Sequence, residues 1–395
     1  MAPLGPFGPA PRLAVGVSGG PHSMALALLA QGFARARGGD AVALIADHGL
    51  RPASGSEAQW TARTLASQGI EGVILPLGLP PGPAMQERAR EARLAALLAE
   101  CAGCGRPFLL LGHHAMDQAE TVLFRALRGS GPAGLAGMAE WRAARQAVIL
   151  RPLLRMAPAR LEALLLSRKL APLRDPSNDD QRFTRVTLRK ALADPSGTGA
   201  GVAALGDAAM AFARRREAMR GTVAARLAAA VTLRPEGWAR LDPSALGLDG
   251  VAEVALAALL RLLGGARHAP ACGAVRSLLA RGGGTLHGVL WQDNVLCREP
   301  SACAAPIAAV RGALWDGRWR LAQSAPDEGQ EGGPLFWGAV GAGVIAIPRR
   351  RRLGLPARVV AGLPALLRNG TILTIPALDA SLQAEFDPQG GPLIG

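Results

Sequence analysis

The segment 18–23, with the sequence SGGPHS, has the composition of an anion-binding turn. It directly follows an apolar stretch, and a helical pattern begins within it. Two glycines let the backbone approach an anion closely, while the amides of a helix start and the hydroxyls of Ser18 and Ser23 can donate to phosphate oxygens. The segment fits neither the P-loop pattern nor the dinucleotide-binding pattern. A phosphate site of another kind and an ordinary serine–glycine turn are the two interpretations that remain.

Charged and imidazole side chains also gather where the second predicted strand ends. Asp47, His48 and Arg51 follow one another closely there. In one interpretation they contact a nucleotide or a metal ion, and in the other Asp47 caps the amides of its own turn. We favour contact with a ligand, because this strand end lies at the same edge of the predicted sheet as the segment 18–23.

A third polar cluster opens a helix directly after a buried strand, in the segment LGHHAMDQAET at 111–121. His114, Asp117 and Glu120 recur every three residues, so they share one helix face near the helix N-terminus. A lone histidine is usually structural, whereas a polar cluster at this position favours function. Asp117 offers the carboxylate oxygens that Mg²⁺ prefers, and Glu120 is a candidate for fixing neighbouring side chains.

Arginine-rich segments accompany these clusters. Arg90 and Arg93 lie on one face of a predicted helix, where they contact phosphate or form a solvated stripe. Arg125 and Arg128 precede the flexible turn GSG. The acidic segment DPSND at 175–179 leads into an arginine-rich segment at 182–189, and together these charges suit a cationic substrate and a phosphate backbone.

Short apolar strands that alternate with helical stretches predict an α/β domain with a parallel sheet covered by helices on both faces. The predicted strands are 13–17, 41–46, 72–77, 108–111 and 148–150. The predicted helices are 23–37, 56–68, 85–100 and 117–127. Ligands of such sheets bind beyond the carboxyl ends of the strands, where all three polar clusters are expected.

Three parts are expected along the 395 residues. A catalytic α/β domain at 1–194 is followed by a Pro- and Gly-rich linker that opens a helical region at 195–283. A small α+β module at 284–395 carries tryptophans between Gly and Pro turns. The three arginines at 214–216 form either a phosphate-facing patch or a solvated helix face.

The net charge of +14 suits a polyanionic partner such as nucleic acid, although a GC-rich genome alone also produces an arginine bias of this kind. Five cysteines make no disulfide framework for a chain of this length, which fits a reducing cytoplasm. The N-terminus lacks the features of a signal peptide, and the apolar segments are too short to span a membrane. We expect a cytoplasmic protein with no membrane partner.

Taken in order, six segments resemble those of bacterial tRNA(Ile)-lysidine synthetases: VSGGPHS, DHGLRP, QERAREARLAAL, LGHHAMDQAETVLFRALRGSG, RPLL and DPSNDDQRFTR. They cover roughly the first half of the chain, and the second half resembles the family only weakly. The resemblance implies an adenine nucleotide alpha-hydrolase-like (PP-loop) fold for the N-terminal domain. It implies ATP-dependent ligation of L-lysine to C2 of the wobble cytidine in CAU-anticodon tRNA(Ile), through an adenylated cytidine, with AMP and diphosphate released.

This resemblance also implies ATP and Mg²⁺ as cofactors, tRNA(Ile) and L-lysine as partners, and roles for three sets of residues. The catalytic set is Asp47, Arg90, Arg93, His114 and Asp117, of which Asp117 is also the implied metal ligand. The ATP-binding set is Val17, Ser18, Gly19, Gly20, Pro21, His22, Ser23, Asp47, His48, Gly112 and His113. The set for tRNA and lysine is Arg125, Arg128, Asp175, Asn178, Arg182 and Arg185. Whether the chain forms a homodimer stays open.

The chain departs from the family pattern at three places. His22 stands where the family has an aspartate that is thought to help hold magnesium, and imidazole is a poor Mg²⁺ ligand. Met116 replaces the first of two aspartates, and Val186 and Thr187 interrupt a further family segment. Either the remaining carboxylates suffice for the metal, or the chain is a catalytically impaired tRNA-binding homologue.

A PP-loop tRNA thiolase is the nearest alternative. Cys101 and Cys104 form the C-x-x-C pair that such an enzyme would use. The pair sits close to the following strand, and the remaining cysteines form no second pair of this kind. We therefore interpret these thiols as structural.

Overall fold

The computed structural model describes residues 1–80, 82, 85–173, 184–322, 333–379, 383–391 and 393. The chain divides into two compact units, Met1–Glu217 and Ala218–Gly395, which we call unit 1 and unit 2. Helix α8 (Ala200–Ala230) contributes residues to both. The three-part division with boundaries at 194 and 283 stays a prediction.

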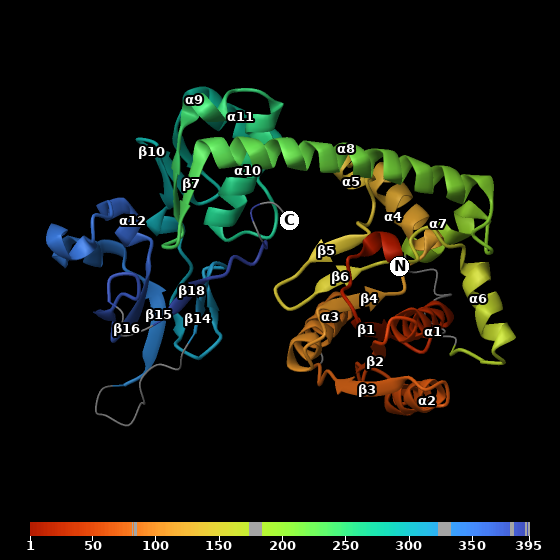
Figure 1. Cartoon of the computed structure of the whole chain (residues 1–395). Coiled ribbons are helices and arrows are strands. Elements are labelled where there is room, and N and C mark those ends of the chain that lie inside the picture. The colour runs from red at the N-terminus through yellow and green to blue at the C-terminus, as the bar shows by residue number, and fades with distance from the viewer. Residues whose placement is uncertain are drawn as a thin grey trace. The chain divides into compact units, whose positions relative to one another are not determined.

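Unit 1 is built on a six-stranded sheet in the order β3-β2-β1-β4-β6-β5 (Figure 1). Its strands are β1 (Arg12–Val17), β2 (Asp40–Asp47), β3 (Glu71–Pro76), β4 (Phe108–Leu111), β5 (Trp141–Ala143) and β6 (Val148–Leu150). The first five strands in this order pair in parallel, and β5 is antiparallel to β6. Because the chain runs outward from β1 to β3 and then returns to β4 beside β1, the strand order reverses between β1 and β4.

Helices cover both faces of this sheet. Besides α8, the helices of unit 1 are α1 (Pro21–Arg35), α2 (Ser54–Ala66), α3 (Met85–Gly103), α4 (Ala115–Leu127), α5 (Pro132–Leu135), α6 (Pro158–Ser167) and α7 (Thr184–Leu192), after a short 3-10 turn η1 (Ala2–Leu4). Leu13 and Val15 of β1 pack in one core with α1 and α6, whereas Ala14 packs in the opposite core with α3. The predicted parallel sheet with helices on both faces is therefore confirmed.

Strand β5 is absent from the predicted elements. Its three residues are all exposed, so they carry no alternation of apolar and polar side chains that could reveal a strand. The tertiary structure adds it as an antiparallel edge through pairing with β6. The five strands that the sequence does predict all overlap observed strands.

Unit 2 combines short helices with three antiparallel sheets, in the orders β7-β8-β11-β10-β9, β12-β15-β16-β17 and β13-β14-β18. The strands are β7 (Val231–Arg234), β8 (Trp238–Leu241), β9 (Gly284–Leu286), β10 (Val289–Gln292), β11 (Val295–Arg298), β12 (Ile307–Ala308), β13 (Leu314–Trp315), β14 (Trp319–Leu321), β15 (Leu335–Ala339), β16 (Pro364–Arg368), β17 (Thr371–Thr374) and β18 (Ala384–Phe386). The helices are α9 (Pro243–Leu246), α10 (Gly250–Gly264), α11 (Cys272–Arg281) and α12 (Ala357–Ala361), with 3-10 turns η3 (Pro300–Ala302), η4 (Gly341–Ala346) and η5 (Arg349–Arg352).

The prediction of a helical region up to about Gly282 is correct for α8, α10 and α11 but wrong at 231–241. There β7 and β8 form a hairpin, and Gly237 in the connecting turn has a φ of +71°, which favours glycine. The pairing of β8 with β11 then draws this hairpin into the five-stranded sheet. The α+β character expected for the C-terminal part is confirmed.

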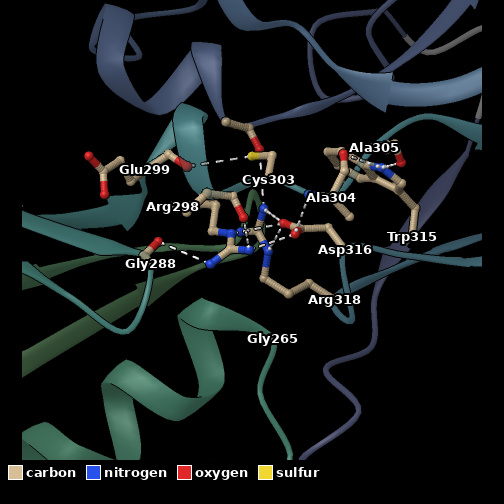
Figure 2. A network of polar contacts seen from close by, with 12 residues as sticks. Gly265, Gly288, Arg298, Glu299, Cys303, Ala304, Ala305, Trp315, Asp316 and Arg318 are labelled. Atoms are coloured by element: carbon tan, nitrogen blue, oxygen red, sulfur yellow. Dashed lines mark hydrogen bonds and ion pairs between the residues drawn. The ribbon is translucent and has the colours of Figure 1, made fainter. Parts of the chain in front are cut away.

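A buried charge network ties the sheets of unit 2 together, as Figure 2 shows. The carboxylate of Asp316 lies between the guanidinium groups of Arg298 and Arg318, each with Nη2 at 2.7 Å from a carboxylate oxygen. The amide of Ala304 also donates to Asp316, at 2.9 Å. Because Arg298 ends β11 and Arg318 directly precedes β14, the network links the five-stranded sheet to the three-stranded sheet.

Helix α8 carries the arginine run that the sequence singled out. Arg214 and Arg215 are exposed, and the guanidinium carbon of Arg215 lies 5.7 Å from the Phe212 ring centroid. This placement fits a solvated face as well as a phosphate-facing patch. Across the described part of the chain, no helix is both long and apolar enough to cross a membrane.

Candidate active site

The turn at 18–23 follows β1 and the segment at 112–117 follows β4, so the reversal of strand order brings them together at the carboxyl edge of the sheet. Two adjoining cavities open at this edge within unit 1, with volumes of about 440 and 660 Å³. We call them the first and the second cavity. Ser18, Arg93 and His113 line both. Small-molecule sites commonly span roughly 300–1,000 Å³, so either cavity has room for part of a nucleotide.

The turn after β1 directs the start of α1 at the first cavity. Gly20 is the N-cap of α1 and has no side chain that could cap the following amides. Ser23 Oγ donates to Gly20 O at 2.9 Å and accepts from Ser18 N at 3.1 Å, which fixes the shape of the turn. Gly19 has a φ of +79°, and a Cβ there would lie 2.6 Å from Thr61 Oγ1. The positive end of the helix dipole therefore faces the cavity, as in phosphate sites.

Gly112 lets the end of β4 approach this turn. A Cβ on Gly112 would lie only 3.1 Å from Ser23 Cα. The close approach places His113 and His114 beside the first turn of α1, and both histidines line the first cavity. The prediction that both segments lie at the carboxyl edge of the sheet is therefore confirmed, and the structure adds that they touch.

Four side chains from three helices form a row along the first cavity, which we call the histidine–carboxylate row: Glu162, His22, His114 and Asp117. Glu162 Oε1 lies 3.8 Å from His22 Nε2. The ring centroids of His22 and His114 are 4.0 Å apart, and Asp117 Oδ2 lies 3.4 Å from His114 Nε2. Asp117 Oδ2 also accepts a hydrogen bond from the His114 amide at 3.0 Å, so this carboxylate anchors the start of α4.

The three imidazoles that line the first cavity, those of His22, His113 and His114, are neutral at neutral pH. Burial lowers the pKa of His22 to about 4, and the nearby His114 acts in the same direction. Burial also lowers the pKa of His113 and of His114 to about 4. Because neutral rings carry no positive charge, they do not neutralise the two carboxylates of the row.

Glu120 lies behind the row and holds an arginine at the cavity. Its side chain is 1% exposed, and Arg189 Nε donates to Glu120 Oε1 at 2.7 Å. Arg189 comes from α7 and lines the first cavity. The hypothesis that Glu120 fixes a neighbouring side chain is therefore confirmed, with Arg189 as that neighbour.

Basic side chains dominate the second cavity. Arg90 and Arg93 of α3 line it, together with His48 after β2. Arg151, which directly follows β6, also lines the second cavity. Its Nη1 donates a hydrogen bond to the carbonyl oxygen of Ala139 at 2.9 Å. Burial lowers the pKa of Arg151 to about 10, with smaller contributions from nearby arginines, so this guanidinium remains charged at neutral pH. A polyphosphate or a nucleic-acid backbone suits such a surface.

Asp47 stands apart from the other expected catalytic residues. Its carboxylate accepts hydrogen bonds from the amide of Gly49, at 3.0 Å, and from the Ser54 hydroxyl. It lies outside the lining of both cavities, as does Gly19. These contacts fit the interpretation in which Asp47 caps its own turn. A catalytic role for Asp47 stays a prediction.

The residues expected to bind tRNA and lysine also lie away from the cavities where the structure describes them. Arg125 Nη1 donates to the carbonyls of Gly134 and Gly137, at 2.8 and 2.9 Å. The guanidinium carbon of Arg128 lies 4.6 Å from the Phe124 ring centroid. Outside the described residues lie Asp175, Asn178, Arg182 and the side chain of Arg185.

The side chains at the first cavity that could ligate a metal suit a cation that arrives bound to phosphate. Among the described residues, no group of three or more His, Cys, Asp or Glu side chains is arranged to hold a metal ion alone. Mg²⁺ needs no such group, because it commonly binds one or two carboxylates together with substrate phosphates and water. Asp117 lines the cavity with its side chain 19% exposed and can serve as one such carboxylate. Met116 also lines this cavity, but it offers no carboxylate, and it packs in an apolar cluster with Ala119 and Val202.

The cysteines form no cluster of the kind that a thiolase uses. All five lie in the described part of the chain as free thiols. Cys104 Sγ donates to the carbonyl of Cys101 at 3.9 Å, and burial raises the pKa of the Cys101 thiol to about 12. A thiol of this kind is a poor nucleophile and a poor metal ligand.

The expected site omitted Arg151, Glu162 and Arg189, which all line the cavities. Arg151 opens the segment RPLL, for which the sequence indicated no separate role. Arg189 lies in the arginine-rich segment that was expected to suit a phosphate backbone, but it was not singled out. Glu162 had no sequence signal, because it sits within an ordinary amphipathic helix. Only the packing of α6 against α1 brings Glu162 to His22.

Comparison with known proteins places these features in a family. The PP-loop domain family matches residues 4–195. A tRNA(Ile)-lysidine synthase from Novosphingobium aromaticivorans is 42% identical over 53% of this chain and 66% of its own length. One from Ruegeria pomeroyi is 34% identical over 93% of this chain and 89% of its own. Among solved structures, a U34-tRNA thiolase from Methanococcus maripaludis matches 53% of this chain and 74% of its own, at 16% identity and a TM-score of 0.45.

Proposed function

The chain belongs to the tRNA(Ile)-lysidine synthase family, and from this premise we propose that it ligates L-lysine to C2 of the wobble cytidine in CAU-anticodon tRNA(Ile). ATP drives the reaction and leaves as AMP and diphosphate. One observation carries the proposal: the amides of the α1 start, the histidine–carboxylate row and Arg189 converge on one cavity at the reversal of strand order.

The first step joins the base to the nucleotide. The O2 of the cytidine attacks the α-phosphate of ATP, the bond between the α- and β-phosphates breaks, and diphosphate leaves. The α1 amides and the hydroxyls of Ser18 and Ser23 hold phosphate oxygens, while Arg93 and Arg189 balance negative charge as it develops. A bound Mg²⁺, held by Asp117, would supply further charge neutralisation on the phosphates.

In the second step the side-chain amine of lysine attacks C2 of the adenylated base. The bond from C2 to the adenylate oxygen breaks, and AMP leaves with that oxygen. Holding the base, the nucleotide and lysine in one place replaces a collision of three molecules with a reaction inside one complex. His113 and His114 line the cavity as neutral imidazoles, so they add no positive charge beside the incoming lysine side chain.

The finer partner assignments form part of the same proposal. The tRNA and lysine contacts are assigned to Arg125, Arg128, Asp175, Asn178, Arg182 and Arg185, and the net charge of +14 supports an RNA partner. A cytoplasmic location is supported by a tRNA substrate and by five cysteines that remain free thiols. Association into a homodimer stays a prediction.

A catalytically impaired tRNA-binding homologue is the second candidate, since His22 replaces an expected carboxylate. Against it, Asp117 retains a carboxylate at the first cavity, where Met116 supplies an apolar side chain that also packs with Ala119 and Val202. The thiolase alternative is weaker, because curated relatives along most of the chain are named tRNA(Ile)-lysidine synthase and Cys101 is a buried thiol.

The deciding experiment incubates the protein with ATP, Mg²⁺, lysine and unmodified CAU-anticodon tRNA(Ile), followed by mass spectrometry of the digested nucleosides. We expect a lysine-sized mass increase on cytidine that disappears when either ATP or lysine is omitted. Salt-sensitive tRNA binding without any mass change would support the impaired homologue. Recovery of the product in His22→Asp would then identify His22 as the cause.

A further inference from the structure

Glu162 is a carboxylate at the first cavity to which the proposed reaction gives no task. It lies on α6, where Leu161 and Leu165 are buried in the core that α6 shares with α1. This packing fixes the rotation of the helix, so that Pro158 and Glu162, which are four residues apart, both line the cavity. The Glu162 side chain is 47% exposed, and its charge is therefore accessible to a ligand in the cavity.

Within the described part of the chain, the carboxylate of Glu162 pairs with no arginine or lysine. The titratable group that it approaches is His22, whose Nε2 lies 3.8 Å from Glu162 Oε1, too far for a hydrogen bond. Burial lowers the pKa of His22 to about 4, so at neutral pH this ring does not balance the charge of the carboxylate. Asp117, the other carboxylate of the lining, is 19% exposed and accepts a hydrogen bond from the His114 amide. Glu162 is therefore the more available of the two to a cationic ligand.

The lining of the first cavity carries both signs of charge. The amides at the start of α1 and the guanidinium groups of Arg93 and Arg189 attract anions. Arg189 is also held by Glu120 through a hydrogen bond of 2.7 Å. Glu162, in contrast, repels phosphate and attracts cations. Of the three substrates of the proposed reaction, ATP and tRNA are polyanions, and lysine alone brings a cationic side chain.

We propose that Glu162 binds the side-chain ammonium of lysine in the first cavity, and that its charge selects an amino acid with a basic side chain. The inference rests on the proposed function, because it takes lysine as a substrate. An ammonium group donates three hydrogen bonds, and a single carboxylate is enough to form an ion pair with it. A metal ion held by side chains alone would need several converging ligands, and the described residues contain no such group. An amine bound by Glu162 lies in the cavity proposed to hold the adenylated base, as the second step requires.

The kinetics of lysidine formation by the full chain test this inference. We expect Glu162→Gln to raise the KM for lysine at least about fivefold, because the amide keeps the size of the side chain and loses its charge. The KM for ATP should not rise, since ATP gains nothing from a carboxylate. Glu162→Asp keeps the charge on a shorter side chain and should raise the KM for lysine less than Glu162→Gln does. Glu100→Gln on α3, which lies outside both cavity linings, is the matched control and should leave the KM for lysine unchanged.

Norleucine, which is lysine without the side-chain amine, separates binding of the ammonium from a general effect on the cavity. As an inhibitor that competes with lysine, it should have the same inhibition constant with the parent protein and with Glu162→Gln. Equal losses of affinity for lysine and norleucine would overturn the inference, because Glu162 would then only shape the cavity.

Three further outcomes separate this inference from the proposed function. If the parent protein forms lysidine and Glu162→Gln has an unchanged KM for lysine, the inference fails and the proposed function stands. The same holds if Glu162→Gln forms no product even at saturating lysine, since binding of the ammonium would not be its main role. If the parent protein forms no lysidine, the proposed function fails and this inference fails with it. Circular dichroism of each variant verifies that the fold is retained.

Discussion

Replacing Asp316 with asparagine should destabilise unit 2 strongly. The side chain of Asp316 is 2% exposed, and those of its partners Arg298 and Arg318 are 11% and 1% exposed. Asparagine keeps the size of the side chain and tolerates the φ of +52° at this position. The substitution therefore removes a charge without adding backbone strain, and it leaves two guanidinium groups buried beside each other.

The expected cost follows from this burial. Removing one partner of a buried ion pair typically costs about 3–5 kcal/mol, because the remaining charge has neither water nor a counter-ion. Here one carboxylate serves two guanidinium groups and the amide of Ala304, so the upper part of that range applies. For domains of comparable size, each kcal/mol lowers the melting temperature by about 2–4 °C. The melting temperature of unit 2 should fall by roughly 8–20 °C.

Asp293→Asn is the matched control. Asp293 also has a positive φ, of +50°, and it pairs with Arg358 at 2.9 Å, but its side chain is 70% exposed. Exposed pairs of this kind contribute about 0–1 kcal/mol. Tryptophan fluorescence during urea or thermal unfolding reports mainly on unit 2, which holds five of the seven tryptophans. Equal and small shifts for both variants would refute the claim that the Asp316 network holds the sheets of unit 2 together.

Three further predictions concern unit 1 and the thiols. Gly19→Ala should lower kcat/KM for lysidine formation at least about 100-fold. The reason is that a Cβ at this position would lie 2.6 Å from Thr61 Oγ1, so the turn proposed to bind phosphate must shift. An unchanged kcat/KM would show that the turn is not part of the site. Unit 1 should lose stability as the pH falls from about 6.5 towards 4. In this range the imidazoles of His22, His113 and His114 bind protons in the unfolded chain but stay neutral when they are buried in the folded chain. Urea midpoints measured across this range should rise with pH, and a flat profile would contradict the burial of these rings. Ellman's reagent should modify the exposed Cys272 at least about tenfold faster than the buried Cys101, and rapid uniform labelling would contradict the described burial.

Local sequence patterns were sufficient to predict five of the six strands in the sheet of unit 1. Apolar strands followed by polar turns and amphipathic helices predict β1 to β4 and β6, because a sheet covered on both faces requires continuous apolar strands. Parallel strands place their carboxyl ends at one edge, so the turn at 18–23 and His114 could be predicted to lie at the same edge before any contact was known. For β5 and the hairpin at 231–241 the local signal was too weak. The residues of β5 are all exposed, and the hairpin joins its sheet through the pairing of β8 with the distant strand β11.

The sequence by itself determined the fold class of unit 1, the edge of the sheet at which the polar clusters gather, and the resemblance to a family. The tertiary structure alone decided which side chains line the cavities at that edge. It placed Glu162 beside His22 and Arg189 beside Glu120, and it left Asp47 on its own turn. The physical reason is that periodicity and spacing fix the face of a single element, whereas contacts between elements far apart in sequence depend on how their surfaces pack.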